Sequence, residues 1–233
     1  MLILAFETSA KAGSVALMDE IRLLGESYCN TGLTHSQTLM SMAEDLLKNC
    51  GRSPADVTAV AVAAGPGSFT GVRIGAAAAK GFAWGAELPC LGVSTLEAMA
   101  RNLGVWQGYV CCAMDARRSQ VYNAIFRAEG GVLTTVAEDR AISLAELGEE
   151  LKILSEPVFL VGDGSDLCYN TLKGSVSGLV RPPEHRQHQR AAGVALVARD
   201  QLLAGHKPSG QELELNYLRL SQAERERLEK EQK

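Results

Sequence analysis

The stretch Ala64-Gly65-Pro66-Gly67-Ser68-Phe69-Thr70-Gly71-Val72-Arg73-Ile74-Gly75 decides how the first part of this chain folds. An unbroken apolar run, 57–64, leads into it, and a run rich in small residues, 71–85, leads out. The glycine–proline turn between them requires backbone conformations that few residues other than glycine adopt. This order predicts a strand, a tight turn and a helix, so the turn is either an anion cradle or a structural corner.

The segments before and after this stretch complete a first unit. Short joints between three apolar runs predict an antiparallel meander. Helical spacing of apolar residues predicts an amphipathic helix, in which Thr34 and Gln37 fit a capping box and Gly51 fits the stop. The predicted elements are strands 2–6, 13–18, 22–29, 57–64 and 90–93 and helices 34–50, 70–84 and 94–102.

A second unit with the same order of strands and then a helix begins after Gly104. Its predicted elements are strands 109–114, 121–127, 132–138 and 158–161 and helices 144–154 and 191–203. Because the two units share one pattern, we expect two related lobes that face a cleft. We divide the chain into lobes 1–104 and 105–220 and a polar tail, 221–233.

The composition excludes several classes of protein. With a net charge of −4, the chain lacks the basic surface that nucleic-acid binding on its own requires. No apolar run reaches the ~18 residues of a membrane span, and the start is too short for a secretory signal. The six cysteines form no CxxC pair, which favours reduced thiols in a cytoplasmic protein and disfavours a zinc site.

Five segments resemble the TsaB (YeaZ) family, which serves the synthesis of threonylcarbamoyladenosine on bacterial tRNA. The match spans nearly the whole chain. The segments are Phe6-Glu7-Thr8-Ser9 with Ser14-Val15-Ala16-Leu17; His35-Ser36-Gln37 with Leu39-Met40; the stretch quoted above with Ala79-Lys80-Gly81; Met114-Asp115-Ala116-Arg117-Arg118 with Val121-Tyr122; and Tyr217-Leu218-Arg219.

This resemblance implies an α/β protein with the actin-like (ASKHA) fold of two ribonuclease-H-like lobes. It also implies a catalytically silent scaffold that binds and stabilises the transferase TsaD. With the ATPase TsaE, that complex would modify tRNAs that read codons beginning with adenine. We expect tRNA to bind only through the complex, and ATP or ADP and metal to sit on the partners. Whether the free chain forms a homodimer is left open.

The relative TsaD holds a metal through two histidines in a segment N-H-L-E-G-H, and the resemblance aligns these positions with Thr95 and Met99. Threonine is a poor ligand, and a thioether suits copper rather than the metals of acyl transfer. We therefore expect no metal and no catalytic residue. The rival hypothesis is an enzyme, either an actin-like kinase or ATPase or a glycopeptidase-like metallopeptidase, and the missing histidine pair weighs against it.

Other polar residues have both a functional and a structural interpretation. The loop after Glu7, with Thr8 and Ser9, lies where actin-like kinases cradle phosphate, and Gly162 and Gly164 lie where an adenosine would approach. We favour loops kept for the fold over a nucleotide site. We also favour a surface loop over a metal site for His185 and His188, a structural role for His35, and an ion pair between Asp115 and Arg117.

The helices of the first lobe are the predicted surface for TsaD. Glycine inside a helix costs about 1 kcal/mol relative to alanine, so close approach of another backbone should compensate for it. That backbone belongs either to the chain's own sheet or to a partner's helix. The predicted contact residues are Leu39, Met42, Leu46, Gly71, Gly75 and Ala79.

Overall fold

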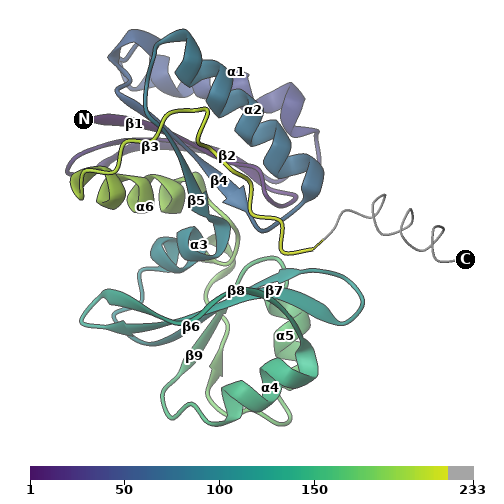
Figure 1. Ribbon diagram of the computed structural model, residues 1–233. Coiled ribbons are helices and arrows are strands. Elements are labelled where there is room, and N and C mark those ends of the chain that lie inside the picture. The colour runs from purple at the N-terminus through teal and green to yellow at the C-terminus, as the bar shows by residue number, and fades with distance from the viewer. Residues whose placement is uncertain (220–233) are drawn as a thin grey trace, which may run out of the picture.

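The computed structural model describes residues 1–219 and contains two five-stranded sheets, one above the other in Figure 1. The strand orders are β3-β2-β1-β4-β5 and β10-β9-β6-β7-β8. The predicted tail, 221–233, lies outside the described residues.

The first sheet comes from the first part of the chain, as the sequence predicts. Its strands are β1 (Leu2–Glu7), β2 (Gly13–Asp19), β3 (Leu23–Cys29), β4 (Ala59–Gly65) and β5 (Cys90–Ser94), and the helices between and after them are α1 (His35–Asn49), α2 (Phe69–Gly85) and α3 (Thr95–Leu103). Strands β1, β2 and β3 form the antiparallel meander, and β4 pairs in parallel with β1 and β5.

The second sheet follows the same plan. Its strands are β6 (Gln107–Asp115), β7 (Gln120–Glu129), β8 (Val132–Ser143), β9 (Val158–Val161) and β10 (Leu179–Val180), and the remaining helices are α4 (Leu144–Lys152), α5 (Ser165–Leu172) and α6 (Ala191–Leu203). Short 3-10 turns occupy Pro54–Asp56 and Glu184–Arg186. The β10 strand and the eight-residue helix α5 were not predicted.

Both faces of β1 and β4 are buried, which explains why these strands are apolar at every position but one. Leu4 and Phe6 lie in a core with α1 and α2, whereas Ile3 and Ala5 face α6. This second face is built from alanines, so α6 approaches closely. A methyl group on Gly193 would overlap the carbonyl oxygen of Ala98 in α3.

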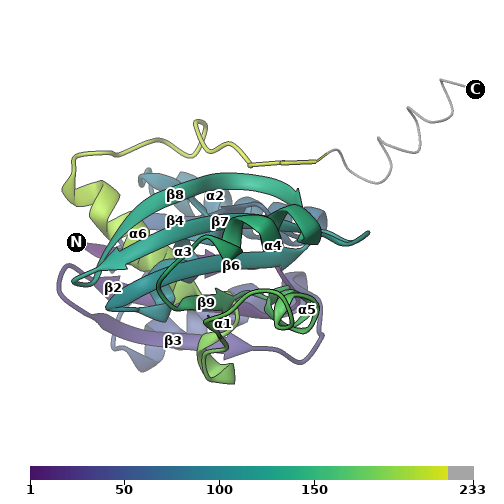
Figure 2. The same ribbon diagram turned by 90° about the horizontal axis from the view of Figure 1, so that it is seen from below.

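The second sheet is covered by α4 and α5 on the face turned away from the first lobe, as Figures 1 and 2 show. Its other face packs against α3, which supplies Leu96, Met99 and Leu103 to that core. Helix α3 thus lies between the two lobes and contacts α6 on its other side.

The last part of the chain returns to the first lobe. Helix α6 belongs to the core of the first sheet, and the segment 206–219, which we call the strap, then runs back along that lobe. Leu213 is buried beside Gly92, and the Asn216 amide donates to the Ala64 carbonyl at 2.8 Å. Two elements from the part of the chain predicted as the second lobe, α6 and the strap, therefore pack on the first sheet.

Within residues 1–219, no helix has both the length and the apolar character that crossing a membrane requires.

Candidate functional site

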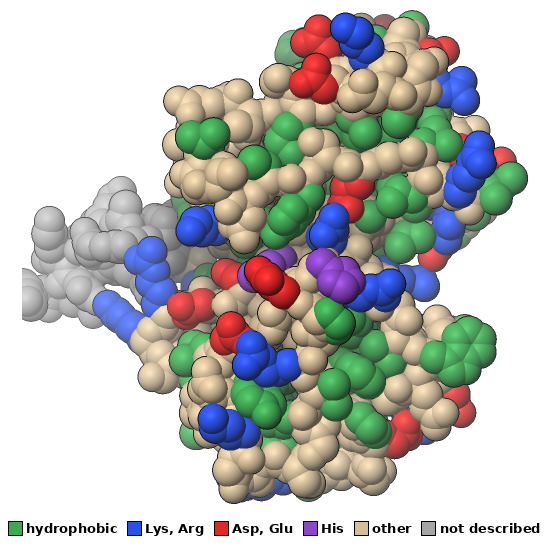
Figure 3. All heavy atoms as spheres, turned by 180° about the vertical axis from the view of Figure 1, so that it is seen from behind, with side chains coloured by type: hydrophobic (Ala, Val, Ile, Leu, Met, Phe, Trp, Pro, Cys, Tyr) green, Lys and Arg blue, Asp and Glu red, His purple; other side chains and the backbone are tan. Residues whose placement is uncertain are grey.

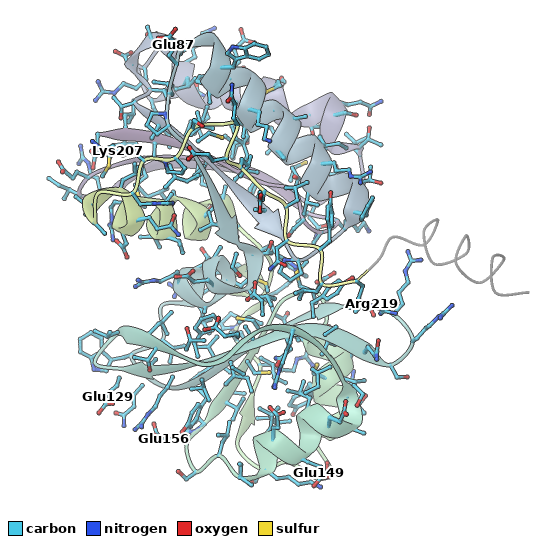
Figure 4. All side chains as sticks on the ribbon, viewed as in Figure 1. Glu87, Glu129, Glu149, Glu156, Lys207 and Arg219 are labelled. Carbon is cyan, nitrogen blue, oxygen red and sulfur yellow. The ribbon has the colours of Figure 1, made fainter. Side chains whose placement is uncertain are left out.

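A cleft of about 500 Å³ lies where the two lobes meet. The first lobe contributes the loop after β1 and the turn before α2, and the second contributes the end of β6 and Asp163. The end of the strap, 216–219, forms a further wall, and Figure 4 shows Arg219 beside the junction of the lobes.

The turn before α2 is pressed against the loop after β1. The Ser68 amide donates to the Ser9 carbonyl at 2.6 Å, and the Thr8 hydroxyl donates to the Gly71 carbonyl at 2.8 Å. A methyl group on Gly71 would overlap the Thr8 carbonyl oxygen. These contacts support the structural corner rather than an anion cradle, because the two donors that could hold an anion are already bonded to carbonyl oxygens of the chain.

Glu7, the last residue of β1, has no exposed surface. One carboxylate oxygen accepts the Ser9 N–H at 2.6 Å, and the other has no hydrogen-bond partner. Burial, reinforced by the nearby charge of Asp163, raises the pKa of Glu7 to about 7. The buried site therefore favours the protonated form of this carboxyl group more than water does.

Gly162 and Gly164, the other candidates for a nucleotide site, are also hydrogen-bonded within the chain. The Gly162 amide donates to the Gln187 carbonyl at 2.6 Å, and the Gly164 amide donates to the Ala113 carbonyl at 3.0 Å. Between them, Asp163 lines the cleft and accepts a hydrogen bond from the Gln189 side chain at 2.9 Å. These two glycines serve close backbone packing, and only Asp163 faces the cleft.

Thr95 and Met99 are buried in the packed interior around α3, with exposures of 0% and 2%. Residues 1–219 hold no group of three or more His, Cys, Asp or Glu side chains that could bind a metal ion. Ser94 caps α3 by accepting the Leu96 and Glu97 amides, and its hydroxyl donates to Asp139 at 2.7 Å.

Two further polar candidates, His35 and Asp115, are hydrogen-bonded to the backbone of the chain. The ring of His35 is hydrogen-bonded to the Ala10 carbonyl at 2.8 Å. The predicted ion pair between Asp115 and Arg117 is absent from the described residues, because the carboxylate instead accepts the Arg117 backbone N–H at 2.7 Å.

The loop that carries the His-x-x-His pair lies at the back of the molecule. Figure 3 shows histidine, acidic and basic side chains gathered between the lobes on this face. Arg190 pairs there with Glu26 at 2.8 Å, and Arg181 pairs with Asp166 at 2.8 Å. These ion pairs support a surface loop that ties the lobes together.

Five of the six residues predicted for the partner surface are buried within this chain. Leu39, Leu46 and Ala79 are 2%, 7% and 0% exposed in the core over the first sheet. Gly71 is buried against the Thr8 carbonyl and Gly75 against the Thr8 and Val62 side chains, so the close neighbours belong to the chain itself. Met42 alone is partly exposed. The apolar stripe identified the buried side of the helices, and the exposed side lies opposite.

The strap carries contacts that the sequence did not reveal. The rings of Phe69 and Tyr217 stack at 4.6 Å, and the Arg73 guanidinium lies 3.8 Å from the Phe69 ring and donates to the Tyr217 hydroxyl. The Arg219 side chain donates to the Ala116 carbonyl in the second lobe at 2.7 Å. The segment 217–219 was recognised as a motif, but no pattern indicated its contacts.

Two sheets of matching order around a cleft define a protein of the actin-like ATPase fold, with two ribonuclease-H-like lobes. Residues 30–226 match the family model described as TsaD: tRNA N6-adenosine threonylcarbamoyltransferase. The chain belongs to the TsaB family within this wider group.

Individual relatives support this assignment. The chain is 37% identical to the tRNA threonylcarbamoyladenosine biosynthesis protein TsaB of Bacillus subtilis, over 72% of this chain and 73% of that protein. It is 38% identical to the Escherichia coli protein of the same name, over 77% and 78% of the two chains. The structure of YeaZ from Pseudomonas aeruginosa superposes with a TM-score of 0.75 at 25% identity, covering 93% of this chain and 99% of that one. These names and the family model support a role in tRNA threonylcarbamoyladenosine biosynthesis.

Proposed function

We propose that this chain is a non-catalytic partner of the TsaD transferase and, with the ATPase TsaE, supports formation of N6-threonylcarbamoyladenosine on tRNA. Two observations support a scaffold rather than an enzyme. The positions that the resemblance aligns with the metal ligands of TsaD hold Thr95 and Met99, both buried. The loops that would cradle a nucleotide bond to each other across Thr8 and Gly71. The six free cysteines also fit a reducing, cytoplasmic compartment.

The observation that carries the partner role is the outer face of α2. Gly81 lies inside this helix, and a Cβ there would meet nothing within 4 Å. Glycine inside a helix costs about 1 kcal/mol relative to alanine. For Gly81, no close contact within the described chain compensates for this cost. Ala77, four residues earlier, is also exposed. Together they leave room for a second helix to approach closely.

Apolar surface flanks this approach. Trp84 is 86% exposed in the last turn of α2. It borders an apolar groove of about 520 Å³ that also includes Ala83, Leu88 and Gly210. On the neighbouring helix α1, Met40 is 48% exposed. A large aromatic side chain beside a groove is the arrangement that protein interfaces favour.

The proposal is tested by co-expression with TsaD from the same organism, followed by size-exclusion chromatography. The wild-type chain should co-elute with TsaD, and Gly81→Glu should abolish co-elution without lowering the melting temperature of the free chain. Gly174→Glu is the matched control, because a Cβ there also meets nothing within 4 Å but lies after α5 in the second lobe.

Three results would refute the proposal. If the wild-type chain does not associate with TsaD, the scaffold role fails. If the purified chain alone hydrolyses ATP, or if stoichiometric metal is lost on replacing Met99, the enzyme hypothesis replaces it.

A further inference from the structure

Three basic side chains line the interlobe cleft, and a fourth adjoins them in sequence. Lys11, Arg117 and Arg219 line the cleft, and Arg118 follows in the turn between β6 and β7. We call these four residues the cationic rim. Among residues 1–219, none of the four has a carboxylate oxygen within 4.0 Å. Arginines elsewhere are often paired, as Arg190 is with Glu26.

The carboxylates nearest the rim are turned toward other donors. Asp115 accepts the backbone N–H of Arg117, and Asp163 accepts the amide of Gln189. The three cations that line the cleft outnumber these two carboxylates, so the cleft carries a net positive charge although the whole chain carries −4. Uncompensated positive charge in a concave surface attracts anions.

The turn that holds two of the arginines is fixed. Arg117, Arg118 and Ser119 have positive φ angles of 63°, 55° and 57°, which side chains other than glycine rarely adopt. Backbone hydrogen bonds hold this conformation, since the Ala116 amide donates to Gln120 at 3.0 Å and the Leu144 amide donates to Ser119 at 3.1 Å. A strained turn that is held so firmly is more common at functional positions than elsewhere.

An aromatic ring adjoins the rim. Tyr217 is 41% exposed, lines the same cleft and is held by its stack on Phe69 and by its hydrogen bond from Arg73. Basic side chains beside a fixed aromatic ring are the combination with which proteins bind unpaired RNA, through phosphate contacts and stacking on bases.

We propose that the cationic rim contacts the phosphate backbone of tRNA within the assembled complex. This inference rests on the proposed function, which brings the chain to a tRNA substrate. Four cations on an acidic chain are too few for tight binding by the free chain at physiological salt. The rim instead adds contacts to those that the partner makes.

The test uses the complex of this chain with TsaD and the double variant Arg117→Glu/Arg118→Glu. The variant should weaken tRNA binding about tenfold at physiological salt and reduce the slope of log K against log salt by about 2, because two phosphate contacts are lost. Arg219 is not replaced, because its side chain also bonds to Ala116.

The matched control is Lys173→Glu/Lys207→Glu. It makes the same change in net charge at two exposed lysines outside the rim, and Figure 4 shows Lys207 and Arg219 on opposite sides of the molecule. Co-elution with TsaD is measured first for every variant, so loss of assembly is distinguished from loss of tRNA contact.

Three outcomes decide the inference. A rim variant that assembles normally and binds tRNA as the control does overturns it. A rim variant that loses ATP binding while keeping its tRNA affinity also overturns it, because the rim then serves a nucleotide. If the wild-type chain does not assemble with TsaD, tRNA binding by the free chain is measured by gel shift at low salt. Weaker binding by the rim variant than by the control variant then supports the inference, and equal binding by the two variants refutes it.

Discussion

Replacing Glu7 with glutamine should change how the stability of this protein depends on pH. Glu7 is wholly buried and has one carboxylate oxygen without a partner. Its pKa rises from 4.5 to about 7 on folding, because burial disfavours the ionised form. Between these two values the folded chain keeps a proton that the unfolded chain has lost. The free energy of unfolding therefore falls as the pH rises through this window.

The size of the effect follows from the shift in pKa. A difference of about 2.5 units corresponds to about 3.5 kcal/mol, at about 1.4 kcal/mol per unit. This contribution is fully present below pH 4.5 and is lost above pH 7. Glutamine has no proton to lose, so Glu7→Gln removes this term. The cost of placing its NH₂ group at the unpartnered position does not depend on pH.

Urea unfolding at several pH values between 5 and 8 measures the difference directly. Relative to wild type, Glu7→Gln should gain about 2–3 kcal/mol on going from pH 5 to pH 8. Glu44→Gln, which changes an exposed carboxylate on α1, is the control and should show no such gain. A constant difference between Glu7→Gln and wild type across this range would refute a buried carboxyl group with a raised pKa.

Three further predictions concern the core, a helix end and metal binding. Leu46→Ala should lower the free energy of unfolding of the isolated chain by about 2–4 kcal/mol in urea titrations, because this side chain is 7% exposed in the core; a change below about 0.5 kcal/mol would contradict its position. Glu26→Gln should cost about 2 kcal/mol by the same assay, because this carboxylate pairs with Arg190 and accepts an amide at the start of α6; an unchanged stability would show that the pair contributes nothing. The chain dialysed against zinc and then against buffer should retain far less than one equivalent by elemental analysis, because buried Thr95 and Met99 offer no ligand set, and stoichiometric zinc would contradict this.

Much of the fold could be predicted because its elements have clear local signals. The apolar run before Gly65 and the small-residue run after it became β4 and α2, and Ser94 caps α3 as its position indicated. The repeated order of strands and helices indicated two lobes. Helix α5 was not predicted, because only eight residues, several of them polar, form it beside the end of β9.

Local signals could not predict which part of the molecule covers each buried face. The apolar side of α1 had to be buried, but the pattern of residues such as Leu39 is the same whether the cover is the chain's own sheet or a partner. Helix α6 has apolar residues on most sides, which predicts that it is buried but does not indicate which sheet it covers. In the cleft, the contacts of Tyr217 and Arg219 depend on residues more than 100 positions earlier, beyond any local pattern.

The return of α6 to the first sheet also has a consequence during synthesis on the ribosome. The face of β1 and β4 that α6 covers is complete once β4 has emerged, but its cover lies at 191–203. At about 5–20 residues per second, the intervening chain takes on the order of ten seconds to make. Throughout that interval the alanine-rich face lacks its final partner, so the first lobe reaches its native packing only after α6 has emerged. An N-terminal fragment that ends before α6 should accordingly depend on chaperones that bind exposed apolar surface.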